Sequence, residues 1–200
     1  MKYFEMFAGV GGFGQGIKQA YEQRLQNNRI DTRKLQAKRK LPSARENTAS
    51  TCVGFSEVNK YASQVLKYHY PNVKNYGDCK TINWPEVPDF DLLVGGSPCQ
   101  DFSIAGKRVG IKGARSGLVW EYIRCLREKQ PRYFIWENVK GVLSSNEGKD
   151  FEYICEEFCK NGYAIDFEVL NAKNFGVPQN RERIFLIGKR LDLIKPDDVI

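Results

Sequence analysis

Histidine is almost absent from this sequence, and its cysteines follow no metal-binding pattern. His69 is the single histidine in 200 residues, and none of the six cysteines belongs to a CxxC pair. Zinc sites are built from closely spaced cysteines and histidines, so we expect no metal site. The lone histidine also argues against catalysis by a Cys–His pair. Cysteines without a disulfide framework are typical of a reducing compartment.

Long apolar runs are absent as well. No segment approaches the roughly 18 consecutive apolar residues that cross a bilayer. Residues 1–5 enter a predicted strand without the apolar region of a signal peptide. Hydrophobic residues make up 42% of the chain and charged residues 28%, which suits a globular domain. We therefore expect a cytoplasmic protein with no membrane partner.

Positive charge is in excess, and it is concentrated in one segment. The net charge is +7, which suits a polyanionic partner such as a nucleic acid. Residues 22–50 contain eight basic and three acidic side chains, so this segment carries +5 of the total. Residues 27–50 lack apolar periodicity and are predicted to be a basic insertion that forms a surface loop. Contact with nucleic acid is the alternative interpretation.

A glycine-rich turn follows the first predicted strand, residues 3–7. Gly9, Gly11 and Gly14 form the pattern GxGxxG, and a helix is predicted from about Ile17. Glycines here allow a tight turn and let a cofactor approach the backbone. The pattern is typical of dinucleotide sites and of S-adenosylmethionine enzymes, and it does not choose between them. A turn without a ligand is the remaining alternative.

Carboxylates follow the next two predicted strands. Glu57 ends the strand 51–56, where an acidic residue can accept both ribose hydroxyls of a cofactor. It could instead favour the start of the predicted helix 58–70. Asp78 follows a short predicted strand at 73–76, where it could accept from an adenine amino group. Its alternative role is that of an ordinary turn residue.

Cys99 follows an apolar run at residues 90–94, and two glycines and Pro98 break that strand just before it. Ligands bind at the carboxyl edge of open α/β sheets, so Cys99 is a candidate nucleophile. A buried thiol in the core is the alternative. The basic, glycine-containing segment 103–116 is predicted to be a mobile lid that touches phosphates, or otherwise a surface loop.

The remaining elements complete an α/β pattern. Helices are predicted at 118–129 and 150–161, and strands at 133–136, 164–170 and 183–188. About ten residues join the last two strands, which is too short for a helical crossover, so they should be antiparallel. We predict a doubly wound sheet with an antiparallel pair at one side. The strand ends then bring Glu57, Asp78, Cys99 and Glu137 to one edge.

Four motifs in this order resemble those of the C5-cytosine-specific DNA methyltransferases. Residues 7–12, FAGVGG, are similar to the family's first cofactor motif, and residues 95–103, GGSPCQDFS, to its nucleophile motif. Residues 137–139, ENV, resemble its acid motif, and Gln179-x-Arg181-x-Arg183 resembles its arginine motif. The similarity covers nearly the whole chain apart from the basic insertion, and it suggests the catalytic portion of such an enzyme.

The resemblance implies a Rossmann-like fold in one catalytic domain, residues 1–200, that transfers a methyl group from S-adenosylmethionine to C5 of cytosine in double-stranded DNA. The product is S-adenosylhomocysteine, and the target base is flipped out of the duplex. Cys99 would add to C6, Glu137 would act at N3, and Arg183 and Arg181 would hold the O2 side. Gln100, Ser103 and Gln179 would lie toward the substrate. The implied cofactor-binding residues are Phe7, Gly9, Gly11, Gly12, Glu57, Asp78, Pro98 and Leu118.

The family's pattern continues beyond these motifs with a target-recognition region and a closing C-terminal segment, and neither is visible in the 200 residues. The sequence is then either part of a longer chain or one subunit of a split enzyme, whose partner would be a second chain that supplies the recognition region. Three other functions stay open at this point. They are a methyltransferase of the same fold acting on tRNA, a non-catalytic nucleic-acid-binding subunit, and a nicotinamide dehydrogenase supported by the glycine turn alone.

Overall fold

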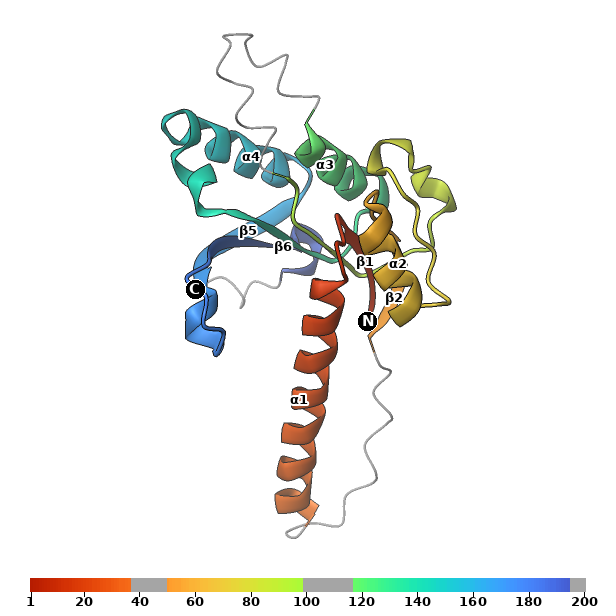
Figure 1. The fold of residues 1–200 in the computed structure, drawn as a ribbon. Helices are drawn as coiled ribbons and strands as arrows, with labels where there is room; N and C mark the ends of the chain where they lie inside the picture. Colours follow the sequence, from red (N-terminus) through yellow and green to blue (C-terminus); the bar gives the residue numbers. More distant parts are fainter. Residues whose placement is uncertain (37–49, 99–116, 195–200) are drawn as a thin grey trace.

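A six-stranded sheet organises the chain in the computed structural model, which describes residues 1–36, 50–98 and 117–194 (Figure 1). The strands lie in the order β2-β1-β3-β4-β6-β5. Their bounds are β1 Lys2–Met6, β2 Thr51–Ser56, β3 Leu92–Gly95, β4 Tyr133–Val139, β5 Tyr163–Asn171 and β6 Glu182–Arg190. The α-helices are α1 Gly12–Gln36, α2 Lys60–His69, α3 Leu118–Lys129 and α4 Lys149–Lys160.

The topology confirms the predicted fold class. Strands β2, β1, β3 and β4 are parallel neighbours, whereas β6 runs antiparallel to both β4 and β5. Parallel strands require crossover connections, and α1, α2 and α3 lie in the connections between them. None of the helices in the described ranges is long and apolar enough to cross a membrane.

Helices cover both faces of the sheet, as Figure 1 shows for α1 on one side and α3 with α4 on the other. Phe4, Leu93 and Trp136 belong to the large core that includes side chains of α3 and α4. Tyr3 and Val94 point to the opposite face, where α1 packs. Because β1 and β3 are covered on both faces, all of their residues except Lys2 are buried.

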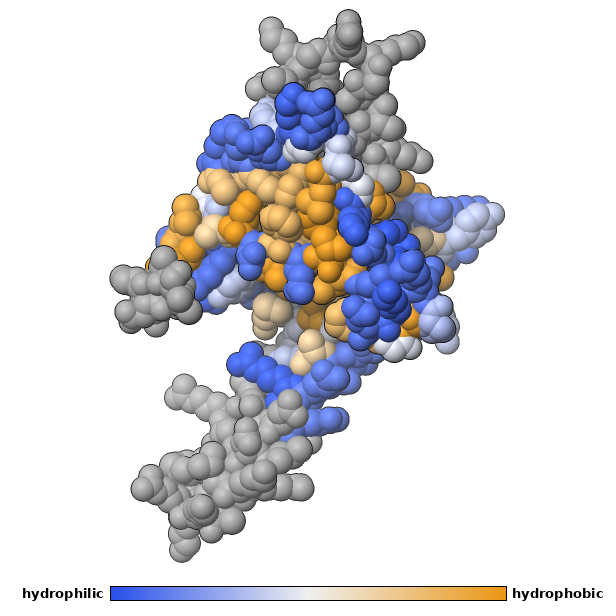
Figure 2. All heavy atoms as spheres, turned by 90° about the vertical axis from the view of Figure 1, so that its left-hand side faces the viewer, coloured by the Kyte–Doolittle hydropathy of each residue, from blue (hydrophilic) through white to orange (hydrophobic). Residues whose placement is uncertain are grey.

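The face shared with α1 is less completely covered over β4 and β6. Ile135 and Phe185 are half-buried there, and Ile187 has 53% of its surface exposed. These residues lie close together because Ile135 pairs with Ile187 across the two strands. Figure 2, which turns the left side of Figure 1 toward the viewer, shows apolar side chains gathered in the middle of the molecule.

Helix α1 differs from its prediction at both ends. It begins at Gly12, not near Ile17, and it continues to Gln36, so the first ten residues of the predicted loop 27–50 are helical. Residues 27–50 were predicted to be a loop because they lack apolar periodicity. A helix can continue without a regular apolar pattern when it contains residues of high helix propensity, such as Arg29, Arg33 and Lys34 of this segment. Residues 37–49 lie outside the described ranges.

Two further boundaries are corrected. The predicted strand 73–76 is only an isolated bridge between Phe55 and Asn75. The Asn75 side chain instead accepts hydrogen bonds from the amides of Glu57 and Gly77, which stabilises a turn. Strand β4 extends to Val139, three residues beyond its prediction, because Val139 still pairs with Arg183 of β6. Glu137 therefore lies within a strand and not after one.

A buried carboxylate holds the start of α1. Glu5 has 1% of its surface exposed, and its two oxygens accept from the amides of Phe13 and Gly14 at 3.2 and 3.0 Å. The two amides, at the N-terminus of the helix, favour the charged form of Glu5. Burial nevertheless dominates and raises the pKa of Glu5 from 4.5 to about 7. Burial likewise raises the pKa of the neighbouring Cys52 thiol to about 12.

We expect the stability of the fold to decrease between pH 4.5 and pH 7 because of Glu5. Its pKa is higher in the folded state, so the folded protein binds this proton more tightly than the unfolded chain does. The free energy of unfolding should therefore fall by about 3 kcal/mol across this range from this group. Glu5→Gln cannot ionise and should remove that part of the pH dependence in urea denaturation.

Glu22→Gln provides the control, because Glu22 is exposed on α1, the helix whose start Glu5 holds. It should leave the pH dependence of unfolding unchanged. If Glu5→Gln retained the slope of the wild-type chain between pH 4.5 and pH 7, Glu5 would not be the group responsible.

Candidate active site

The glycine-rich turn leaves β1 with a backbone that most side chains avoid. Phe7, Gly9 and Gly11 all have positive φ, at 54°, 54° and 84°. The two glycines adopt this conformation at no steric cost, whereas Phe7 is strained there. The Gly11 amide closes the turn by donating to the carbonyl of Ala8 at 2.8 Å. Strain at a non-glycine residue is often found where the backbone must meet a ligand.

A pocket of about 420 Å³ opens at the carboxyl ends of the strands, beside this turn. We call it the Glu57 pocket. Five of the residues predicted to bind a cofactor line it, which are Phe7, Glu57, Asp78, Pro98 and Leu118. The predicted glycines are placed differently. Gly12 lines a neighbouring pocket, and Gly11 packs against Leu66 and Tyr70.

Hydrogen bonds from two backbone amides orient the Glu57 carboxylate. One oxygen accepts from the Gly9 amide at 2.7 Å, and the other accepts from the Asn59 amide at 2.7 Å. Asn75 fixes the Glu57 backbone from the other side, accepting at 3.0 Å and donating at 2.9 Å. A carboxylate has about four acceptor sites, so Glu57 can still receive the hydroxyls of a bound ligand. Gly9 thus acts by orienting Glu57.

Asp78 serves as a helix cap and as a pocket wall. Its side chain accepts from the Lys80 amide at 3.0 Å and so caps the short 3-10 helix Cys79–Thr81. It also lines the Glu57 pocket, together with Lys80. The two interpretations of Asp78 as a turn residue and as a pocket residue are therefore compatible.

The predicted acid and arginines lie together at the end of β4. Arg183 Nε is 2.9 Å from Glu137 Oε1, and Arg181 Nη2 is 4.0 Å from the same oxygen. Glu137 and Arg183 are mostly buried, and the side chain of Arg181 is half exposed. Gln179 lies exposed in the connection before β6, where its amide donates to the Val177 carbonyl. Cys99, Gln100 and Ser103 lie outside the described residues.

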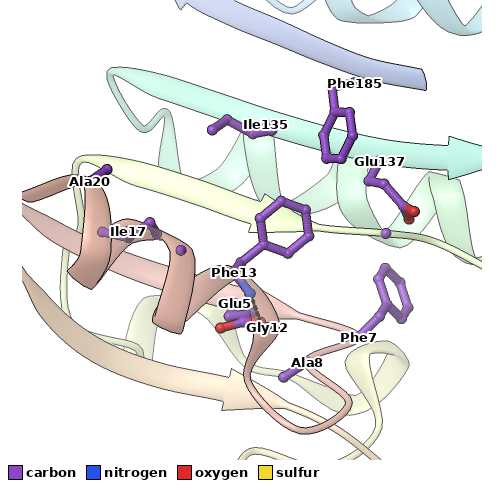
Figure 3. Close-up of a pocket in the computed structure, with 12 residues that line it drawn as sticks. Glu5, Phe7, Ala8, Gly12, Phe13, Ile17, Ala20, Ile135, Glu137 and Phe185 are labelled. Atoms are coloured by element: carbon purple, nitrogen blue, oxygen red, sulfur yellow. Dashed lines mark hydrogen bonds between the residues drawn. The ribbon is translucent and has the colours of Figure 1, made fainter. Parts of the chain in front are cut away.

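A second pocket, of about 570 Å³, lies between α1 and the strands β4 and β6. Figure 3 shows Phe13 of α1 and Phe185 of β6 in this space, with Glu137 and Phe7 at one end. Phe7 and Gly96 line both pockets and form their shared wall. Glu137 of β4, the predicted acid, is thus directly adjacent to the residues predicted to bind a cofactor.

Several residues of this region were not predicted. Ser97, Trp136 and Asn138 form a buried hydrogen-bonded group beside the turn that precedes Cys99. Ser56 and Lys80 line the Glu57 pocket. The sequence signal for the buried group is weak, since its partners are about 40 positions apart. Within the described ranges, no group of three or more His, Cys, Asp or Glu residues could hold a metal ion.

The Glu57 pocket has the properties that a nucleoside cofactor requires. One carboxylate lies where it can accept from a diol, and a second lies where it can accept from an amino group. Phe7, Val58 and Leu118 supply apolar surface between them, as small-molecule sites usually do. These residues therefore fit the nucleoside part of a cofactor such as S-adenosylmethionine.

Comparison with known proteins matches this chain to a DNA methylase family and to individual methyltransferases. The family model of C-5 cytosine-specific DNA methylases matches residues 1–198. The orphan methyltransferase M.Rho11sI of Bacillus phage rho11s is 51% identical over 148 residues, covering 73% of this chain and 29% of the relative. The type II methyltransferase M.NlaIV of Neisseria lactamica is 36% identical over 204 residues, covering 98% of this chain and 43% of the relative.

Solved structures share the fold at low sequence identity. A putative DNA modification methyltransferase from an E. coli prophage has a TM-score of 0.67 and 20% identity, covering all of this chain and 50% of its own. Dnmt2 of S. pombe has a TM-score of 0.61 and 17% identity, covering all of this chain and 53% of its own. The chain spans about three tenths to one half of the lengths of these proteins.

Proposed function

Since the chain belongs to the C-5 cytosine-specific DNA methylase family, we propose that it carries the catalytic half of a DNA (cytosine-5-)-methyltransferase. The observation that carries the proposal is the adjacency of two groups at one sheet edge. The Glu137–Arg183 pair lies beside Gly96, and Gly96 also lines the Glu57 pocket. A base held by the first group would therefore lie next to a cofactor held in the second.

The cofactor in this proposal is S-adenosylmethionine, which supplies an activated methyl group on a sulfonium and leaves as S-adenosylhomocysteine. Glu57 would accept from the ribose hydroxyls, and Asp78 from the adenine amino group. Phe7, Pro98 and Leu118 would border the ligand, since all three line the pocket. Gly9 would contribute by keeping the Glu57 carboxylate oriented, through its 2.7 Å hydrogen bond.

Chemistry at the base requires a nucleophile and an acid, because cytosine C5 is itself a poor nucleophile. Addition of the Cys99 thiolate to C6 forms a carbon–sulfur bond and makes C5 electron-rich. Glu137 would protonate N3 or donate a hydrogen bond to it, so that negative charge does not build up on the ring. Arg183 is already paired with Glu137 at 2.9 Å, and with Arg181 it would hold the O2 side of the base. Gln100, Ser103 and Gln179 would complete the substrate side.

Double-stranded DNA is the proposed substrate, and the cytoplasm is where the enzyme would act on it. Recognition of a DNA site would come from the rest of the protein or from a second chain, because this chain spans less than half of its curated relatives M.Rho11sI and M.NlaIV. The half-covered apolar surface of Ile135, Phe185 and Ile187 supports this, since apolar side chains grouped on a sheet normally pack against another element.

Labelled methyl transfer and covalent trapping test the proposal. Trapping uses DNA that contains 5-fluorocytosine, because the methylated adduct cannot lose fluorine. We expect transfer to duplex DNA and not to tRNA, and an adduct that contains Cys99. Both assays are run with the chain alone and with a recognition region added. No adduct in either case would contradict enzymatic function.

Cys99→Ala should abolish transfer and adduct formation while leaving S-adenosylmethionine binding largely intact, because the thiol is proposed to touch the base and not the cofactor. Cys159→Ala is the control, since Cys159 is exposed on α4, and it should behave like the wild-type chain. Equal loss of transfer and of cofactor affinity in Cys99→Ala would show a structural role instead.

Gly96→Ala should lower the transfer rate by about tenfold to a hundredfold, because a Cβ at this position would overlap the Glu137 carboxylate. The carboxylate can swing aside at little cost in stability, but it then leaves Arg183. Gly141→Ala is the control, because its Cβ would meet no heavy atom within 4 Å. A normal rate in Gly96→Ala would show that the position of Glu137 is not critical.

A further inference from the structure

Strand β4 presents different chemistry on its two faces. Glu137 points toward the α1 side, where it meets Arg183 and Gly96. Its neighbours Trp136 and Asn138 point to the opposite side, because successive side chains of a strand alternate. Both are buried, with 0% and 2% of their surfaces exposed. A single strand therefore supplies the proposed acid on one face and two polar groups on the other.

Those two polar groups bind the turn that precedes Cys99. The indole N–H of Trp136 donates to Ser97 Oγ at 3.0 Å. The amide nitrogen of Asn138 donates to the Ser97 carbonyl at 3.1 Å and lies 3.5 Å from Ser97 Oγ. Asn138 is itself held, because its side-chain oxygen accepts from the Val139 amide at 2.8 Å. Ser97 has 4% of its surface exposed, so water competes little for these bonds.

We propose that Ser97 is a positioning residue, which ties the turn carrying the nucleophile to the strand carrying the acid. This inference rests on the proposed function. The pairing of Gly95 with Trp136 brings the two elements side by side, and the Ser97 hydrogen bonds then fix the turn two residues before Cys99. Buried hydrogen-bonded networks of this kind hold their members in one geometry.

The position of this turn matters because two protein groups must reach two atoms of the same cytosine ring at once. Cys99 must meet C6 while Glu137 meets N3, and a misplacement of about 1 Å can cost about a hundredfold in rate. The turn is also confined on its other side, since a Cβ at Gly95 would overlap the Met6 carbonyl of β1. In the proposed function, a fixed turn would also keep the thiol where nearby positive charge and backbone amides could stabilise its anion, and its pKa would then lie below the free value of about 8.5.

The test compares Ser97→Ala, Trp136→Phe and the double variant in the full chain. Ser97→Ala leaves a buried indole N–H without its acceptor, and such unsatisfied groups are unfavourable. We expect its rate of adduct formation on 5-fluorocytosine DNA to fall by about tenfold to a hundredfold. S-adenosylmethionine affinity should stay within about twofold, because the network lies outside the Glu57 pocket. Adding Trp136→Phe removes the unpaired N–H, so the double variant should be no slower than Ser97→Ala.

A second readout needs neither DNA nor cofactor. Alkylation of Cys99 is followed by peptide mass spectrometry against pH, with exposed Cys159 as the internal reference. We expect the pH midpoint for Cys99 to rise toward about 8.5 in Ser97→Ala while the midpoint for Cys159 stays the same. The indole resonance of Trp136, assigned by its loss in Trp136→Phe, should also shift in Ser97→Ala.

The two readouts separate this inference from the proposed function. If the wild-type chain with its recognition region forms no adduct, the proposed function fails, and the alkylation midpoint alone decides the role of Ser97. An adduct rate and a midpoint both unchanged in Ser97→Ala overturn the inference. Parallel loss of S-adenosylmethionine affinity also overturns it, because the serine would then support the whole fold of this edge.

Discussion

The register between β3 and β4 determines where the chemistry of this molecule can occur. Gly95 lies opposite Trp136, so the next residues, Gly96 and Glu137, emerge as neighbours at the same edge. The side-chain period of a strand is two, so a slip by one residue would turn Glu137 into the apolar core under α3 and α4. That slip would also turn Trp136 toward the pocket between α1 and β4, which Glu137 now lines. Burial of β3 on both faces makes such a slip costly, because its register is then strongly specified.

The second requirement is that the backbone after β3 lies close to its neighbours, and glycine permits this at two consecutive positions. Gly95 has no room for a side chain because of the Met6 carbonyl, and Gly96 has none because of the Glu137 carboxylate. The turn that leads to Cys99 is thus pressed between β1 and β4. The same compactness allows Gly96 and Phe7 to form the shared wall of two pockets. In the proposed function, the cofactor and the base would meet at this wall.

The sequence predicted those features that depend on local pattern. Strand β2 and helix α3 have the predicted bounds, because each combines a clear apolar pattern with well-defined ends. The meeting of Glu57 and Asp78 followed from the rule that strand ends converge on one edge, whereas Leu118 was expected from the family resemblance alone. The extent of α1 was missed because it has no apolar face beyond its first turns. The contact of Ser97 with Trp136 was missed because it depends on the register of two strands, which no local pattern encodes.

Helix α1 begins at the carboxyl edge of the sheet and runs back past its amino edge, as Figure 1 shows. Twenty-five residues of helix span about 37 Å, since each residue adds about 1.5 Å. Its far end is therefore remote from Glu57 and Glu137 at the carboxyl edge. A fluorescent label or a fused domain attached at this end would lie away from both pockets.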